Sequence, residues 1–274
     1  MENKDTLLLK TLYSGLSNGT ERSFLIGGPY GGRRWPTRIA YQLVSEVVEC
    51  GAKVKRFRTG DTVLTGTFPG HVEYHLAREG NLIARLPDDL DRRSASLLGV
   101  AAVSYHDVRR AKVNAEDSVL VIGDGLIGQF AAQAARLCGA RVLLAGHHDD
   151  RLAAARDIGL ETLNTVGDEG RAQAKGRAPF SVVMECSGAD VFDWIMGDWG
   201  RPGLVGRRSR ARLVLVAGRD EVHYRFGPAG MTEIDILHTQ HFDQCDLDDV
   251  VELAAEGKLQ VEPLIRDVVP LSEA

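Results

Sequence analysis

Two patterns of apolar and polar positions divide the chain. Over roughly the first 90 residues, short apolar or alternating runs such as TLLLKTLYSG, QLVSEVVECG and KVKRFRTGDTVLTG are punctuated by Gly and Asp. Such runs predict short β-strands joined by turns, in a compact antiparallel or barrel-like unit. The segment LDRRSASLLGVAAVSYHDVRRAKV then has apolar residues at helical spacing, and beyond it strands and helices alternate.

The alternating part of the chain predicts an α/β unit. Four continuous apolar runs, each ended by glycine, read as buried strands: SVLVIG, RVLLAG, FSVVMECSG and ARLVLVAG. Amphipathic or Ala-rich stretches separate the first three, including LIGQFAAQAARLCG and DDRLAAARDIG. Continuous Val, Leu and Ile runs between helices are what a parallel sheet covered on both faces requires. The fold class we expect is therefore α/β, with a β-rich domain preceding a doubly wound parallel sheet.

Composition and charge narrow the class of protein further. Hydrophobic residues make up 44% and charged residues 26% of the 274 residues, which excludes long disorder and fibrous designs. The net charge of −5 gives no electrostatic indication of binding to nucleic acids or anionic membranes. The arginine-rich segment 201–212 is expected to be a solvated loop. No apolar stretch approaches a membrane span of about 18 residues, and no signal peptide is evident. We expect a cytoplasmic protein.

The cysteines favour the same environment. The four cysteines lie far apart without a CxxC pair, which argues against a disulfide framework or a four-cysteine zinc lobe and suits a reducing cytosol.

A glycine-rich turn is the strongest functional motif. GDGLIG places Gly123, Gly125 and Gly128 directly after the strand SVLVI and at the start of a helix. The first glycine permits the tight turn, the second lets a pyrophosphate approach the backbone, and the third allows close packing of helix on strand. Together with Leu126 and Ile127, these residues are the predicted phosphate contacts at the positive end of the helix dipole.

The end of the next strand indicates which dinucleotide binds. An Asp or Glu about 20 residues past the glycines usually accepts hydrogen bonds from the ribose of NAD. Here the strand RVLLA ends in Gly146, His147 and His148, so two cations replace a carboxylate and favour the 2′-phosphate of NADP(H) over NAD(H). Alternatively, Asp149 or Asp150 bends back to the ribose. The candidate contacts at this end are Gly146, His147, His148 and Arg151.

In order and spacing, these segments resemble the medium-chain dehydrogenase/reductase superfamily. Further segments agree: GTE at 19–21, GDTV at 60–63, VEYH at 72–75, LP at 86–87 and EGKLQVEPLI at 256–265. The resemblance covers nearly the whole chain. It implies a GroES-like catalytic domain over residues 1–106, completed by 256–274, and a Rossmann domain over 107–255. Compared with relatives, the chain is expected to be short at both ends, as a pared-down variant or a fragment.

The resemblance also shows a departure. Where zinc-dependent members carry their catalytic ligands and the Gly-His-Glu segment, this chain has Asn18, Tyr41, Gln42 and Gly99. None supplies a thiolate or imidazole, so we expect no zinc. Within the superfamily, SGLSNGTE and AYQLVSEVVECG resemble the zinc-free branch of bacteriochlorophyllide dehydrogenase-type and secondary-metabolite alcohol dehydrogenases.

Without zinc, hydrogen-bond donors must polarise the substrate oxygen. Tyr41, at the place of the zinc-binding histidine, is the first candidate for a donor or general acid, the alternative being a packed strand aromatic. Thr20 matches the hydroxyl that passes protons in the zinc enzymes, although such a residue also serves in local turns. Asn18 and Gln42 are candidates for orienting the substrate oxygen, and Glu21 is a candidate supporting carboxylate.

The histidines are weaker candidates. His71 and His75 flank the presumed cleft, where a half-buried structural role is the more common one. His238, His241 and Cys245 would share one face if their segment were a helix, but no fourth metal ligand accompanies them. We therefore predict no metal site.

These observations imply a zinc-independent oxidoreductase that transfers a hydride between NADP(H) and a secondary alcohol or ketone. The alternatives are a quinone or enoyl reductase of the same superfamily, and a catalytically silent NADPH-binding or redox-sensing protein. The segment MTEIDILHT at 231–239 has the alternation of an edge strand, which together with the resemblance predicts a homodimer. The expected ligand is a small-molecule substrate, with neither nucleic acid nor membrane as a partner.

Overall fold

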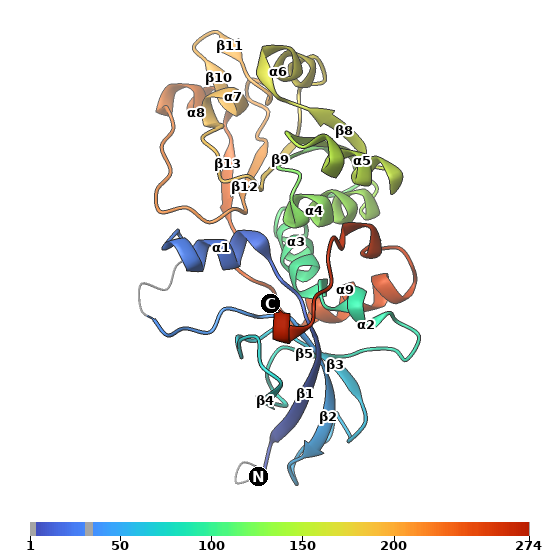
Figure 1. The fold of residues 1–274 in the computed structure, drawn as a ribbon. Helices are drawn as coiled ribbons and strands as arrows, with labels where there is room; N and C mark the ends of the chain where they lie inside the picture. The colour runs from blue at the N-terminus through green and yellow to red at the C-terminus, as the bar shows by residue number, and fades with distance from the viewer. Residues whose placement is uncertain (1–3, 31–34, 274) are drawn as a thin grey trace. The chain divides into compact units, whose positions relative to one another are not determined.

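The chain folds into two compact units. A computed structural model describes residues 4–30 and 35–273. Of the described residues, the first unit comprises 4–27, 35–102 and 242–273, and the second comprises 28–30 and 103–241 (Figure 1). Helix α3 (Leu98–Arg110) starts in the first unit and ends in the second. The predicted fold class, a β-rich unit followed by an α/β unit, is confirmed.

The first unit is built on an antiparallel sheet with the strand order β4-β1-β2-β3-β5. Its strands are β1 (Thr6–Ser14), β2 (Leu43–Cys50), β3 (Thr62–Thr65), β4 (Tyr74–Arg78) and β5 (Ile83–Arg85). Its helices are α1 (Asn18–Ile26), α2 (Arg92–Ala95) and α9 (Gln244–Ala255), with 3-10 turns at Glu262–Leu264 and Leu271–Glu273. Alternation on β1 and β2 buries Leu7, Leu9 and Val47 in one apolar cluster with Phe57 and Ile83.

The second unit contains a six-stranded parallel sheet in the order β13-β12-β9-β6-β7-β8. This order is that of the doubly wound dinucleotide-binding fold. The sheet strands are β6 (Ser118–Ile122), β7 (Arg141–Gly146), β8 (Glu161–Asn164), β9 (Val182–Glu185), β12 (Arg212–Leu215) and β13 (Asp235–His238). The helices are α4 (Leu126–Leu137), α5 (Asp149–Asp157), α6 (Gly167–Gly176), α7 (Phe192–Met196) and α8 (Phe226–Thr232), and β10 (Gly197–Asp198) pairs with β11 (Arg201–Pro202).

Both faces of the parallel sheet are covered, which explains the continuous apolar runs. Along β6, Val119 and Val121 point into one buried cluster, whereas Leu120 and Ile122 point into another. A strand buried on both faces has no polar side, so its sequence shows no alternation. Strand β13 lies at one edge of this sheet, as its alternating sequence predicts.

Three local features differ from the sequence-based expectations. The segment after β1 forms a helix, α1, that ends at Gly27 in the left-handed region, rather than only a turn. Helix α9 contacts strand β5 and belongs to the first unit, whereas the sequence division placed residues up to 255 with the second. The arginine-rich segment 201–212 is not a solvated loop throughout, because only half of its residues are exposed, Leu204 and Val205 are buried, and its ends belong to β11 and β12.

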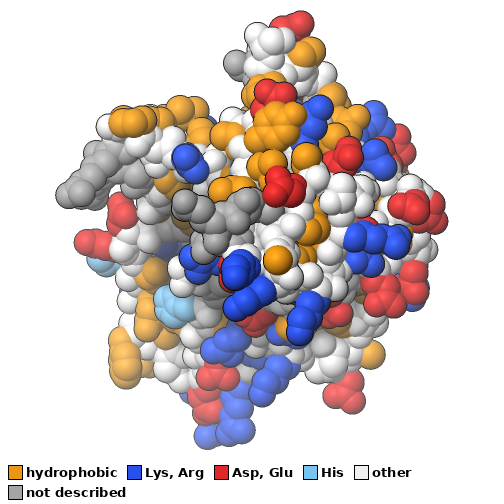
Figure 2. Space-filling view, turned by 90° about the horizontal axis from the view of Figure 1, so that it is seen from below, with side chains coloured by type: hydrophobic (Ala, Val, Ile, Leu, Met, Phe, Trp, Pro, Cys, Tyr) orange, Lys and Arg blue, Asp and Glu red, His pale blue; other side chains and the backbone are white. Residues whose placement is uncertain are grey.

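The surface carries charges of both signs. On the face shown in Figure 2, Lys and Arg side chains stand next to Asp and Glu side chains, with hydrophobic atoms between them. All four cysteines are free thiols. Burial raises the pKa of Cys186, and the charge of Asp107 acts in the same direction, so this thiol is poorly nucleophilic. Among the described residues, no helix combines the length and the hydropathy that crossing a membrane requires.

Candidate cofactor and catalytic sites

The glycine-rich turn lies between β6 and α4, at the carboxyl end of the parallel sheet. Gly123 has φ +117°, a backbone conformation that other residues rarely adopt. A Cβ at Gly128 would stand 1.8 Å from the carbonyl oxygen of Gly123, so close packing of α4 on the turn requires glycine there. At Gly125, by contrast, a Cβ would meet nothing within 4 Å.

The open space at Gly125 fits a dinucleotide. Gly125 is the N-cap of the 12-residue helix α4, whose first turn also contains Leu126 and Ile127. The first N–H groups of a helix lack intrahelical partners and carry the positive end of the helix dipole. Bare backbone, free space and a helix N-terminus therefore coincide where a pyrophosphate would bind.

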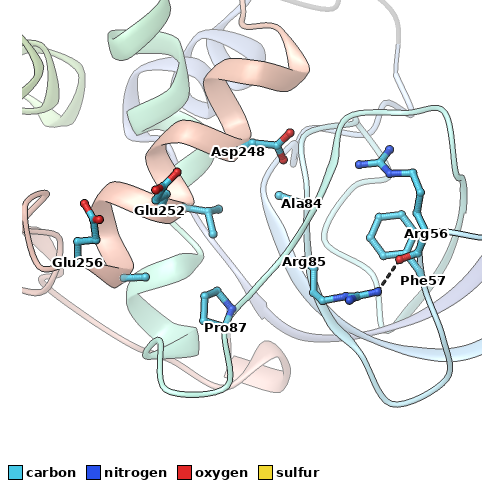
Figure 3. A pocket seen from close by; sticks show the side chains of 10 residues that line it. Arg56, Phe57, Ala84, Arg85, Pro87, Asp248, Glu252 and Glu256 are labelled. Carbon is cyan, nitrogen blue, oxygen red and sulfur yellow. Dashed lines mark hydrogen bonds between the residues drawn. The ribbon is translucent and has the colours of Figure 1, made fainter.

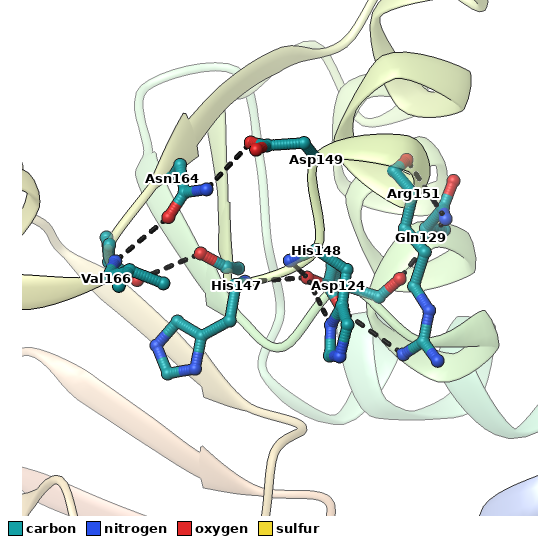
Figure 4. Close-up of polar contacts among 10 residues, drawn as sticks. Asp124, Gln129, His147, His148, Asp149, Arg151, Asn164 and Val166 are labelled. Carbon is teal, nitrogen blue, oxygen red and sulfur yellow. Dashed lines mark hydrogen bonds and ion pairs between the residues drawn. The ribbon is translucent and has the colours of Figure 1, made fainter.

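Asp124, the residue between the first two glycines, organises the end of β7 (Figure 4). Its carboxylate is buried and accepts hydrogen bonds from the backbone N–H groups of His147 at 2.7 Å and His148 at 2.8 Å. The imidazole Nδ1 of His148 lies 3.0 Å from Asp124 Oδ1, and the Arg151 guanidinium lies 3.3 Å from the same oxygen. Burial alone would raise the pKa of Asp124, but the N–H bonds and the imidazole of His148 outweigh it and hold that pKa below its ordinary value.

The remaining polar groups of this loop have separate roles. In Figure 4 the ring of His147 points away from Asp124. Asp149 accepts a hydrogen bond at 2.7 Å from the side chain of Asn164, which lies on β8. This bond competes with the alternative in which Asp149 turns toward the ribose. Sequence reasoning missed Asp124, although an acidic residue inside a glycine motif, opposite a glycine at the end of the next strand, is a readable signal.

A second set of polar side chains lies in the first unit, where β1 ends. His71 Nδ1 is 2.7 Å from the Ser14 hydroxyl, and His71 Nε2 is 3.4 Å from Glu21 Oε2. The Glu21 side chain is only 4% exposed, and its other oxygen accepts a long hydrogen bond from the N–H of Ser17 at 3.4 Å. Glu21 Oε2 is buried and has no hydrogen-bond partner among the described residues, so the Ser14–His71 hydrogen bond ends beside a buried carboxylate rather than on it. Sequence reasoning considered His71 and Glu21 separately and did not join them.

The predicted catalytic residues of the first unit lie in different environments. Asn18 is exposed and begins α1, while Thr20 accepts a hydrogen bond from the Ser17 hydroxyl at 3.4 Å. Tyr41 is 5% exposed, with its ring centroid 5.5 Å from that of Phe68. All three belong to the first unit.

Gln42 has a packing role in the same region. It is fully buried, and its Oε1 accepts a hydrogen bond from the N–H of Val100 at 2.9 Å. A Cβ at Gly99 would stand 2.7 Å from the Gln42 side chain, so Gln42 fills the space above the first turn of α3. Gln42 therefore ties β2 to α3.

The other candidate positions are not brought together as a helix face. His238 ends β13, His241 follows in a loop with φ +56°, and Cys245 lies in α9. The helical spacing suggested for these residues does not exist, because the segment is a strand, a loop and a helix in turn.

A cavity of about 540 Å³ in the first unit lies apart from these residues (Figure 3). Arg56 and Arg85 line one side, and Asp248, Glu252 and Glu256 of α9 line the other. None of the predicted site residues reaches it.

Comparisons with known proteins identify the relatives of this chain. No protein-family model matches it. The chain is 29% identical over 213 residues to 2-dehydro-3-deoxy-L-galactonate 5-dehydrogenase of Pseudoalteromonas atlantica, a match that covers 75% of this chain and 59% of that protein. It is 26% identical over 283 residues to 2-desacetyl-2-hydroxyethyl bacteriochlorophyllide A dehydrogenase of Rhodobacter capsulatus, covering 98% of this chain and 83% of that protein.

A solved structure confirms the fold. Galactitol-1-phosphate dehydrogenase from Escherichia coli superposes with a TM-score of 0.82 at 19% identity, over 97% of this chain and 86% of that chain. The sheet order and the glycine turn define a protein of the dinucleotide-binding class with a separate β-rich unit. Together with the relatives, they are consistent with the resemblance to the medium-chain dehydrogenase/reductase superfamily.

Proposed function

We propose that this protein is an NAD(P)(H)-dependent oxidoreductase that interconverts a secondary alcohol and a ketone without zinc. The observation that carries the proposal is the glycine turn at the start of α4, with open space at Gly125 and close packing at Gly128, in a sheet of dinucleotide-binding order. The names of the relatives support the reaction, since both matched proteins are dehydrogenases. The substrate class follows from those names by analogy.

The bound nicotinamide would supply the hydride chemistry, and the chain's own residues would bind and orient the reactants. The backbone of the glycine turn and of Leu126 and Ile127 would hold the pyrophosphate, and the loop from Gly146 to Arg151 would contact the adenosine. The expected preference for NADP(H) counted His147 and His148 as two cations. In the structure, His148 is hydrogen-bonded to Asp124, which weakens that basis.

In the first unit, the Ser14, His71 and Glu21 chain is the proposed route for the substrate proton. A hydroxyl hydrogen-bonded to an imidazole, which lies 3.4 Å from a carboxylate oxygen, would pass a proton with only a small movement of the imidazole. The Thr20 and Ser17 hydroxyls provide a second, shorter pair at the start of α1. Tyr41 and Asn18 remain proposed donors to the substrate oxygen.

Zinc independence is proposed from the chemistry of the side chains. The positions that would carry zinc ligands hold an amide, a phenol and a glycine, and the Gln42 amide already bonds to the backbone. These groups are poor ligands for zinc, which prefers thiolate, imidazole and carboxylate. A homodimer is proposed from the edge position of β13, where unpaired backbone groups invite a second strand.

The decisive experiment follows reduced-cofactor absorbance with the purified, untagged protein. Secondary alcohols and ketones should be turned over, whereas turnover of activated alkenes or quinones alone would identify an enoyl or quinone reductase. Cofactor binding without turnover of any of these substrates would identify a silent binding protein. Elemental analysis of the same preparation should find less than one zinc per chain, and stoichiometric zinc would contradict the metal-free mechanism.

Variants test the proton route. Glu21→Gln and His71→Asn should each lower kcat/KM at least about tenfold, because each breaks the chain of proton transfer. The matched control is His223→Asn, since His223 also pairs with a glutamate, Glu221 at 2.8 Å, but on the surface. If Tyr41→Phe leaves kcat/KM unchanged, Tyr41 is a packing residue.

A further inference from the structure

A side chain from the glycine turn fills the space at the end of β7 in which a ribose-binding carboxylate would normally lie. In dinucleotide-binding folds, an Asp or Glu at the end of the second strand accepts hydrogen bonds from the ribose hydroxyls. This chain has Gly146 there, and a Cβ at Gly146 would stand 2.3 Å from Asp124 Oδ2 and 2.6 Å from Asp124 Cγ. The carboxylate of Asp124, which comes from the glycine turn, therefore occupies the space of the missing side chain.

Asp124 also takes up the donors that a 2′-phosphate would require. The two backbone N–H groups after β7, the imidazole of His148 and the guanidinium of Arg151 all point at its carboxylate. An N–H pair with two basic side chains is the donor set that binds a phosphate. Here an internal anion already occupies that set, and its side chain is only 5% exposed.

We propose that Asp124 makes this protein select NAD(H) over NADP(H), by holding the 2′-phosphate donors and by repelling a second anion. The proposal rests on the proposed function, because it specifies which dinucleotide the same site takes. A 2′-phosphate would have to displace a buried carboxylate from four hydrogen-bond donors or lie beside it, and like charges at close range destabilise each other. NAD(H), which has a 2′-hydroxyl, meets neither penalty.

Isothermal titration of the full chain with NADH and NADPH measures this selectivity without turnover. The wild-type protein should bind NADH at least about tenfold more tightly, the scale of one charge-assisted hydrogen bond. Asp124→Asn removes the negative charge with little change in shape, so the affinity ratio should shift at least about tenfold toward NADPH. Adding Arg151→Gln to that variant should reverse most of the shift, because Arg151 would then be the freed partner of the phosphate.

A matched control separates the position of the charge from its amount. Asp157→Asn removes the same charge from helix α5, which also carries Arg151, but Asp157 is exposed at the other end of that helix, away from the donor set. It should leave the ratio within about threefold of wild type, a change under 1 kcal/mol.

Each outcome bears on the inference. Wild-type protein that binds NADPH as tightly as NADH overturns it, whether or not any variant folds. An equal shift in Asp124→Asn and Asp157→Asn also overturns it, since net charge alone would then explain the preference. Binding of neither dinucleotide refutes the proposed function and this inference together, whereas selective NADH binding without turnover supports the inference and contradicts only the proposed activity.

Discussion

His75 makes the stability of the first unit dependent on pH. It lies on β4 opposite Leu9 of β1 and is 8% exposed. Its Nδ1 is 3.5 Å from the Thr11 hydroxyl, and among the described residues its Nε2 has no hydrogen-bond partner. Burial lowers the pKa of His75 from 6.5 to about 4, because the charged imidazolium would lose its hydration.

The size of the effect follows from proton linkage. Below pH 6.5 the unfolded chain binds a proton at His75 that the folded chain does not bind until about pH 4, so stability falls as the pH falls through this window. Between pH 7 and pH 5 the loss is about 2 kcal/mol for a fully desolvated group, and residual solvation reduces it to about 1–2 kcal/mol.

Urea unfolding at pH 7 and pH 5 tests this for the wild-type protein and His75→Gln, which cannot titrate in that range. The variant should lose about 1–2 kcal/mol less than wild type between the two values. His223→Gln, at an exposed histidine, serves as the control and should behave as wild type. Equal losses in wild type and His75→Gln would show that His75 is not the titrating group.

Other predictions concern the glycine turn and the amide behind it. Gly125→Ala should leave the unfolding free energy, measured by urea unfolding, within about 0.5 kcal/mol of wild type. The same variant should weaken dinucleotide binding, measured by titration, by about tenfold, because the added Cβ meets no protein atom and enters only the space of the pyrophosphate. Gly128→Ala should instead destabilise the free protein by more than about 2 kcal/mol in the same urea experiment. Gln42→Leu should lower the unfolding free energy by about 1–3 kcal/mol and retain kcat, because it removes the hydrogen bond from the N–H of Val100. A loss of kcat without destabilisation would instead indicate a catalytic role for Gln42.

Much of the fold was predictable because its signals are local. Val119 to Ile122 form a continuous apolar run, and only a strand covered on both faces explains such a run. The turn at Gly123 depends on one positive φ and on contacts within six residues, so its motif is readable from sequence alone. The edge position of β13 was also predicted, although Ile236 and Leu237 pack against the apolar clusters on opposite faces of the sheet.

The polar sites were less predictable because they join residues distant in sequence. Asp124 meets residues 147, 148 and 151, and Glu21 meets His71, through contacts between segments that are distant in the sequence. A preference for NADP(H) followed reasonably from histidines counted as free charges. That count could not include a buried carboxylate from another loop, and the charge of a site depends on all the groups that face it.

Three buried carboxylates show how the fold separates structural anions from reactive ones. Asp124 accepts from two backbone N–H groups and two basic side chains, and Glu185 accepts from the N–H groups of Ser187 and Gly188 and pairs with Arg219. Both oxygens of Asp124 accept hydrogen bonds, whereas Glu185 accepts through Oε1 alone and meets Arg219 at Oε2 only as an ion pair. Glu21 accepts only one long N–H bond, and its second oxygen faces an imidazole.

A buried carboxylate with unfilled acceptor capacity can accept a further hydrogen bond when a donor approaches it. Of the three, Glu21 alone lies next to an imidazole that is hydrogen-bonded to a hydroxyl. The count of donors that supports Asp124 as the proposed selector of the cofactor therefore also supports Glu21, with His71 and Ser14, as the proposed proton route.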